Sequence, residues 1–267
     1  MADNPELLSA ETEATQLPKR PSRRFAVFAL LAAAALTAAA LTYRASQWVP
    51  PFYQQTLVAD RADLAAFGDD LERELLNLHS EINDDGHWEG VFSDEQINGW
   101  LAVDMLDKFP QLLPPAIKDP RVIIKDSQMH MACQYQNGGV SVVLSLAADV
   151  SLTERPNEIA VRLRNARIGA VPGLIRQAMP TISLAAIRSG VRIYWQQLES
   201  DPVAIVKIPV DVFDEGHDLI VESVHLTEGR LAVTGRVDAP EPEEETESPQ
   251  EVTARESQPA KNDNRQL

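Results

Sequence analysis

The sequence predicts an α+β protein in which a single N-terminal transmembrane helix is followed by a twisted antiparallel sheet packed on amphipathic helices. Three observations lead to this prediction. Residues 25–43 contain no charge, residues 54–79 and 93–109 repeat apolar side chains at helical spacing, and from residue 122 onward apolar and polar residues alternate along several short segments.

The uncharged segment 25–43 has the length of a membrane span. A helix rises about 1.5 Å per residue, so nineteen residues reach roughly 28 Å, close to the thickness of the bilayer hydrocarbon. Basic residues precede it, namely Lys19, Arg20, Arg23 and Arg24. Because basic flanks stay on the cytoplasmic side, we expect a cytoplasmic N-terminus and an exported main domain. The alternative is a cleaved secretory signal, for which the apolar run and its leader are unusually long.

The chain divides into five predicted regions. They are a disordered cytoplasmic leader (1–24), the transmembrane helix (25–43), a juxtamembrane segment with an amphipathic helix (44–90), an extracytoplasmic α+β domain (91–237) and a disordered acidic tail (238–267). The leader is polar and contains three prolines, and the tail has nine acids against three bases. Neither region holds enough apolar residues to form a core.

Two helices are predicted between the membrane span and the strands. Residues 54–79 carry a leucine-rich stripe opposite acidic positions, and we expect this helix to pack on the domain, with a coiled stalk as the alternative. Ser93 begins the second helix, because Ser93 and Gln96 have the spacing of a capping box. Pro110 ends it.

The remaining chain reads mainly as strands and turns. Strands are predicted at 122–125, 128–136, 140–152, 159–164, 203–212, 218–226 and 230–237. Between them, residues 165–173 are expected to leave the sheet and lead into a helix over 180–198. Its predicted apolar stripe is Leu184, Ile187, Val191, Tyr194 and Leu198. In the strand 159–164 we expect Arg162 and Arg164 to face outward.

The charge is strongly negative and unevenly distributed. A net charge of −16 argues against nucleic acid as a partner, since binding requires clustered cations. Residues 60–107 hold fourteen acids and two bases, whereas 155–192 hold seven arginines and one acid. One interpretation is that these segments are solvated faces or pair with one another in the fold. The other is that Arg162, Arg164 and Arg176 form a surface that binds anionic headgroups or envelope polymers.

The sequence contains no recognised catalytic signature. Nucleophile-elbow, zinc-protease, P-loop and dinucleotide motifs are absent, and the five histidines have no metal-ligand spacing. We therefore predict no metal, no cofactor and no enzymatic activity; a hydrolase would need a convergent acid/base pair. Cys133, the single cysteine, is expected to be a small apolar residue on a strand.

Two short motifs resemble a known group of proteins. The segments FSDEQINGWL (92–101) and ARIGAVPGLI (166–175) are similar to those of the bacterial YpmS-like and YceB-like extracytoplasmic proteins. This resemblance implies a tubular lipid-binding-like fold, in which a curved sheet wraps a helix and shelters acyl chains. The small Ala170 departs from the pattern of two apolar residues before the proline, which leaves the depth of any groove open.

The resemblance and the membrane helix together predict a protein of the bacterial cell membrane with a periplasmic domain that binds a lipid or another hydrophobic ligand. The residues expected to line the groove or the core are Trp100, Leu101, Met129, Met131, Leu184, Ile187 and Val191. The alternative is a non-enzymatic envelope scaffold with a packed core that binds a protein partner.

Overall fold

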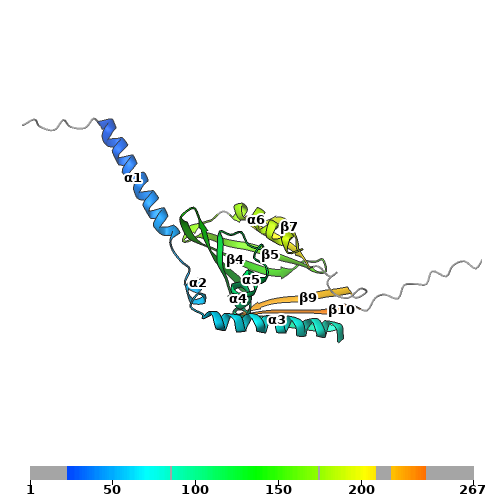
Figure 1. Cartoon of the computed structure of the whole chain (residues 1–267). Helices are drawn as coiled ribbons and strands as arrows, with labels where there is room; N and C mark the ends of the chain where they lie inside the picture. The colour runs from blue at the N-terminus through cyan, green and yellow to red at the C-terminus, as the bar shows by residue number, and fades with distance from the viewer. Residues whose placement is uncertain (1–22, 85, 174, 209–217, 239–267) are drawn as a thin grey trace, which may run out of the picture.

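The computed structural model describes residues 23–84, 86–173, 175–208 and 218–238. The chain is α+β, with antiparallel sheets and one apolar N-terminal helix (Figure 1). The predicted leader up to residue 22, the tail beyond Asp238 and the end of the predicted strand 203–212 from residue 209 lie outside the described residues.

The first helix, α1 (Arg23–Ser46), projects away from the sheets (Figure 1). Among the described residues it is the one helix long and apolar enough to cross a membrane, over Val27–Ser46, and none of that stretch is buried in the protein. Phe28 and Leu36 are 72% and 73% exposed. The helix therefore has an apolar surface that no other part of the described chain covers.

The prediction of one continuous helix over residues 54–79 is wrong, because the structure has two helices here. They are α2 (Pro51–Thr56) and α3 (Arg61–Asp84). The Asp60 carbonyl accepts the first helical hydrogen bond of α3, from the Leu64 amide. Tyr53 is 2% exposed and its hydroxyl donates to the Asp119 carbonyl at 2.8 Å, which fixes α2 on the domain.

The capping box at Ser93 is confirmed. The Ser93 hydroxyl accepts from the Gln96 amide at 3.1 Å, and the Gln96 side chain accepts from the Ser93 amide at 2.8 Å. The helix that follows is divided at Val103 into α4 (Asp94–Ala102) and α5 (Asp104–Lys108). It is preceded by the strand β1 (His87–Ser93), which the sequence analysis did not predict.

The helices α3 and α4 pack closely on each other, and α3 also packs on β1. Gly99 makes this approach fit, since a Cβ there would lie 2.8 Å from the Phe67 Cβ.

The strands form two antiparallel sheets rather than the single sheet predicted. The smaller sheet has the order β1-β10-β9, with β9 (Asp218–Thr227) and β10 (Arg230–Asp238) forming the predicted hairpin. The larger sheet has the order β2-β3-β4-β5-β8-β7, and β6 (Val171–Pro172) pairs with β5. Its other strands are β2 (Ile117–Lys125), β3 (Gln128–Asn137), β4 (Val140–Leu152), β5 (Glu158–Ile168), β7 (Arg192–Leu198) and β8 (Asp201–Lys207).

The predicted helix 180–198 is wrong beyond residue 188. Helix α6 covers Ile175–Arg188 with Pro180 inside it, and the chain then enters β7. Gly190 has a φ of +74°, which ends the helix, and the run Ile193-Tyr194-Trp195 favours an extended chain. The stretch 165–173 also differs from expectation, because β5 continues to Ile168 and turns back through β6.

The two sheets meet through a buried cluster. Ile82 of α3 and Trp88 of β1 pack with Leu219 and Val221 of β9, and Leu152 of β4 lies against this group. The side chain of Asn157 strengthens the junction by donating to the Leu219 carbonyl at 2.6 Å and accepting from the Val221 amide at 2.9 Å. The smaller sheet is thereby fixed to the Leu152 end of β4.

Candidate functional site

The register of the larger sheet places apolar side chains together on one face, which we call the apolar face. Residues paired across antiparallel strands share a face, and alternate residues along each strand do so too. The paired rows include Ile124, Met129, Ala148 and Leu163, and Val150, Val161, Ala204 and Trp195. Further members are Val122, Met131, Cys133, Leu144, Leu146, Leu152, Ile159, Ile168, Ile193 and Val206.

The apolar face is only partly covered. Its centre is buried, with Ile124 and Ala148 at 1% exposure. Met131, Leu144 and Leu146 are half-buried, and Ile168 is 38% exposed. A filled core would leave little of these side chains in contact with water, because apolar side chains in cores are close-packed.

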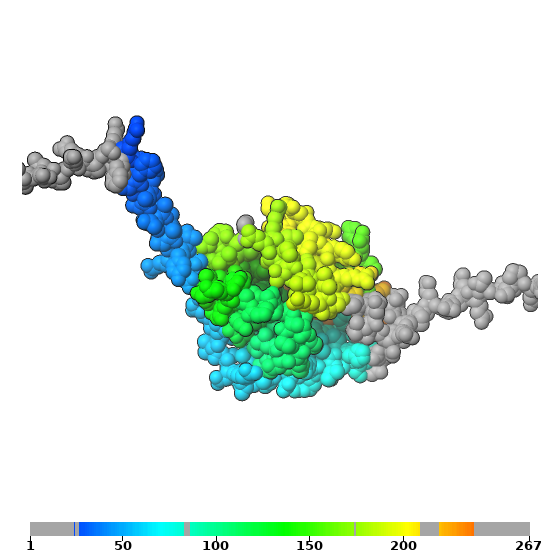
Figure 2. All heavy atoms as spheres, turned by 45° about the horizontal axis from the view of Figure 1, so that its top comes forward, coloured from blue at the N-terminus to red at the C-terminus, as the bar shows by residue number. Residues whose placement is uncertain are grey.

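Helix α6 covers part of this face loosely. The Ser183 hydroxyl accepts a hydrogen bond from the Trp195 indole at 2.8 Å, which places α6 beside β7. Its last residue, Arg188, donates to the Gln111 carbonyl at 3.0 Å in the loop before β2. All of α6 lies within the described residues, and none of its residues is buried. Figure 2 shows a recess between the yellow surface of α6 and β7 and the green surface that precedes it in the chain.

The predicted ligand-lining residues are divided between several places. Met129 and Met131 lie together on the apolar face. Leu184 and Ile187 lie on α6 and are 48% and 70% exposed. Val191 lies in the turn between α6 and β7 rather than on a helix.

Trp100 and Leu101 lie on α4, outside the rows of the apolar face. Both are half-buried, and the Trp100 ring packs on that of Phe109 with their centroids 6.2 Å apart. The residues that sequence reasoning did not assign to the site are Cys133, Leu144, Leu146 and Ile168. The alternation of Cys133, Leu144 and Leu146 was visible in the sequence, but their register was not. Ile168 lies beyond the predicted strand 159–164, after an irregularity in the pairing of β4 with β5.

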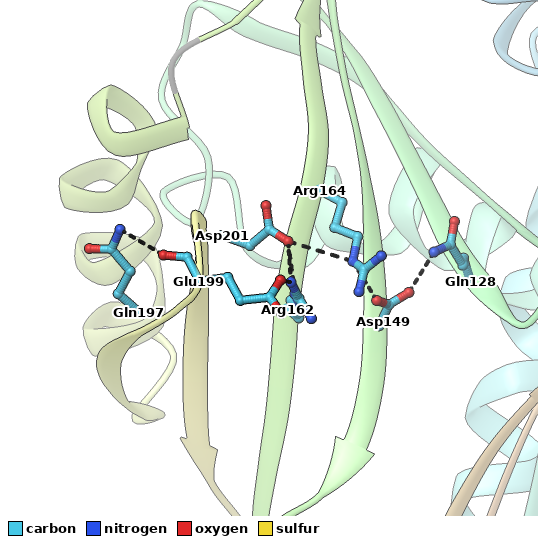
Figure 3. Close-up of polar contacts among 7 residues, drawn as sticks. All are labelled: Gln128, Asp149, Arg162, Arg164, Gln197, Glu199 and Asp201. Atoms are coloured by element: carbon cyan, nitrogen blue, oxygen red, sulfur yellow. Dashed lines mark hydrogen bonds and ion pairs between the residues drawn. The ribbon is translucent and has the colours of Figure 1, made fainter.

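The opposite face of the larger sheet buries Ala132 and Val143 against Tyr53 of α2, and it also carries an ion-pair network (Figure 3). Arg162 binds Asp201 at 2.7 Å and Glu199 at 2.8 Å. Arg164 lies 2.7 Å from Asp149, whose other oxygen accepts from Gln128 at 2.6 Å. The hydrogen bonds that Arg162 donates to Glu199, first, and to Asp201 raise the pKa of its guanidinium.

The three arginines of the predicted cationic surface each have a polar partner. Arg162 and Arg164 face three carboxylates, so their charges are offset locally. Arg176 is on α6, and its guanidinium lies 3.4 Å from the side-chain oxygen of Gln197. The three arginines therefore do not form one unpaired cationic patch.

Two buried polar side chains of α4 satisfy the free edge of β2. Asn98, 6% exposed, donates to the Val122 carbonyl and accepts from the Val122 amide, both at 2.7 Å. Asp94 accepts from the Ile124 amide at 3.1 Å, and burial raises the pKa of this carboxyl while that hydrogen bond opposes the rise. These side chains take the place of a neighbouring strand, which explains both residues structurally.

Burial shifts the pKa of two side chains of the larger sheet and its cover, namely Cys133 on the apolar face and Tyr53 of α2, which packs on the opposite face. Burial raises the pKa of the Cys133 thiol to about 11. Burial, followed by the nearby Asp119, raises the pKa of the Tyr53 hydroxyl to about 12. Neither group is thus a ready nucleophile at neutral pH. Within the described part of the chain, no three His, Cys, Asp or Glu side chains could hold a metal ion.

A small polar pocket of about 200 Å³ lies on the opposite face. Its lining combines charged and amphipathic side chains, namely Arg155, Glu158, Tyr194, Gln196, Ile205 and Lys207. Arg155 and Glu158 face each other at 3.8 Å across it. This pocket is separate from the apolar face.

Comparisons with known proteins add no relative to this picture. No protein-family model matches the chain, and neither a curated protein nor a solved structure has significant similarity to it.

Proposed function

We propose that this chain is a single-pass membrane protein whose domain binds a lipid or another hydrophobic ligand on the apolar face of the larger sheet. In this proposal the larger sheet is twisted, and α6 closes over the ligand as a loose cover. The membrane is a bacterial cell membrane, with the N-terminus in the cytoplasm and the domain in the periplasm. The proposed architecture corresponds to the tubular lipid-binding-like fold of the YpmS-like and YceB-like proteins.

The partial exposure of the apolar face supports the proposal most strongly. Contiguous apolar surface of this kind marks interaction sites in soluble domains. Covering each methylene of a ligand is worth about 0.8 kcal/mol, so ten methylenes give roughly 8 kcal/mol before the costs of binding.

The loose packing of α6 also supports a ligand site. The side-chain hydrogen bonds of α6 to the rest of the domain join Ser183 to Trp195, Arg176 to Gln197 and Arg188 to Gln111. Since none of the described residues of α6 is buried, the helix can move without breaking a buried core. Its exposed Leu184 and Ile187 provide apolar surface that a ligand of sufficient length would cover.

The test is photolabelling of the full chain in lipid nanodiscs with a diazirine-bearing fatty acid, followed by mass spectrometry of the labelled peptides. We expect saturable labelling on β3 and β4. Leu146→Trp fills the apolar face and should lower this labelling at least tenfold. Ser141→Trp adds the same side chain to the opposite face of β4 and should leave labelling unchanged.

The comparison of Leu146→Trp with Ser141→Trp requires that both variants are folded. Thermal unfolding of each variant shows that it is folded. If folded Leu146→Trp labels β3 and β4 as strongly as the unaltered chain, the face does not bind the fatty acid, and the scaffold with a packed core becomes the better interpretation. If carbonate washing releases the chain from vesicles, the membrane part of the proposal is wrong.

A further inference from the structure

The end of α1 is fixed directly to the larger sheet. The Ala170 amide donates to the Ala45 carbonyl at 2.8 Å, in the turn between β5 and β6. Gly169 has a φ of +58°, and a Cβ there would lie only 2.6 Å from the Ala45 carbonyl oxygen. The site therefore requires glycine both for its backbone conformation and for space.

This contact brings the apolar face to the end of α1. Ile168 directly precedes Gly169, pairs with Leu144 and is 38% exposed. The Gly169 amide donates to the Val143 carbonyl at 2.7 Å, so the turn is also fixed to β4. The exposed margin of the apolar face thus lies beside Ala45, within the apolar stretch Val27–Ser46.

The β3–β4 hairpin tip lies at the same end of the sheet. It turns through Gly138 and Gly139, and Val140 beyond the turn is 56% exposed. Figure 1 shows a green hairpin next to the lower end of α1. Tyr43 and Trp48 are exposed close to that end, and these residue types prefer the boundary between lipid and water.

We infer that this margin of the apolar face, formed by Ile168, Leu144 and the Val140 hairpin tip, sits on the bilayer that holds α1 and takes up a lipid acyl chain sideways from it. This inference rests on the proposed function and adds the source of the ligand and its direction of entry. The smaller sheet packs on Leu152 at the far end of the face, so the end beside α1 is the open end at which a chain would enter.

The length of the face suits one acyl chain. Leu144 and Leu152 are eight residues apart on β4, which corresponds to about 26 Å at ~3.3 Å per residue. One leaflet contributes about 15 Å of hydrocarbon, half of the ~30 Å core. A single chain can therefore leave its leaflet and lie entirely along the face.

The experiment measures contact between the hairpin tip and the bilayer. A fluorophore is attached to Val140→Cys in a Cys133→Ala background, and the full chain is reconstituted in phosphatidylcholine vesicles with headgroup spin-labelled lipid. We expect strong quenching at this position. Glu154→Cys, at the opposite end of β4, should be quenched at least fivefold less, because β4 separates the two positions by about 40 Å.

Two glycine variants test whether the contact with α1 sets this orientation. Gly169→Ala introduces a Cβ that collides with the end of α1, and Gly190→Ala has a similar φ but open space. We expect quenching at position 140 to fall at least threefold in Gly169→Ala and to be unchanged in Gly190→Ala. Fatty-acid photolabelling of β4 should persist in both variants.

Equal quenching at positions 140 and 154 would overturn this inference, and so would unchanged quenching in Gly169→Ala. The proposed function would survive either result as long as Leu146→Trp still abolishes photolabelling, so the failure of one proposal is distinguishable from the failure of the other.

Discussion

Cys133 shows how the apolar face changes the chemistry of a single residue. Burial disfavours the charged thiolate, so the pKa of this thiol rises from 9.0 to about 11 in the folded chain. Between these two pH values the unfolded chain loses the proton and the folded chain keeps it. The free energy of unfolding therefore falls as pH rises through this window, and the contribution of Cys133 is fully present below pH 9.

The same shift predicts slow alkylation. At pH 8 we expect iodoacetamide to modify Cys133 about one hundred times more slowly in the folded chain than in urea, because two pKa units reduce the thiolate fraction about a hundredfold. The rate in the folded chain should keep rising about tenfold per pH unit toward pH 11. A plateau near pH 9 would show that the thiol is solvated.

The face of the sheet on which a side chain lies could be predicted where the alternation of apolar and polar residues along one strand determines it. Arg162 and Arg164 lie on the face opposite Met129 and Met131, which are on the apolar face. Their partners were not predictable, because Glu199 and Asp201 meet Arg162 only after the pairing of β5 with β8 is formed. For the same reason, the pairing of Leu144 with Ile168 could not be predicted before the register of β4 and β5 was known.

At the scale of elements, the edge of β2 depends on one amide side chain. Asn98→Ala removes two hydrogen bonds and leaves the buried Val122 amide and carbonyl without these partners. An unsatisfied buried group costs about 1–3 kcal/mol, so we expect a loss of roughly 2–4 kcal/mol in the free energy of unfolding. Urea unfolding of the full chain in detergent measures it.

The matched control is Asn77→Ala on the exposed side of α3, which should change stability by no more than about 0.5 kcal/mol. Equal losses in the two variants would mean that Asn98 does not hold the edge of β2.

Helix and strand were hard to separate between residues 189 and 198. Apolar residues at 184, 187, 191, 194 and 198 fit a helical stripe, yet Ile193 and Trp195 also alternate as in a strand. Pairing with β8 along seven positions decided in favour of the strand. By contrast, the capping box at Ser93 and the hairpin of β9 and β10 are local, and both were predicted correctly.

At the scale of the whole molecule, the division into two sheets could not be predicted from local pattern. The smaller sheet joins β1 to β10, which begin more than 140 residues apart in the chain. The short β1, with Gly90 at its centre, resembles a turn in the sequence. It becomes a strand because Trp88 enters the cluster with Leu219 and Val221.

The two ends of the apolar face differ in their surroundings, because one lies beside α1 and the other beside the smaller sheet. The apolar face is most exposed beside the end of α1 and is covered where the smaller sheet packs on Leu152. Under the proposed function, this gradient orients a bound chain with its tail away from the membrane.

Protection of Cys133 by a bound ligand tests the central claim most directly, since this sole thiol of the chain lies on the apolar face. The full chain in nanodiscs is treated with N-ethylmaleimide at pH 8, with and without saturating palmitate. We predict that palmitate slows the reaction at least tenfold in the unaltered chain and has no effect in Leu146→Trp. An unchanged rate in the unaltered chain, under conditions where the fatty acid photolabels the protein, would contradict binding on this face.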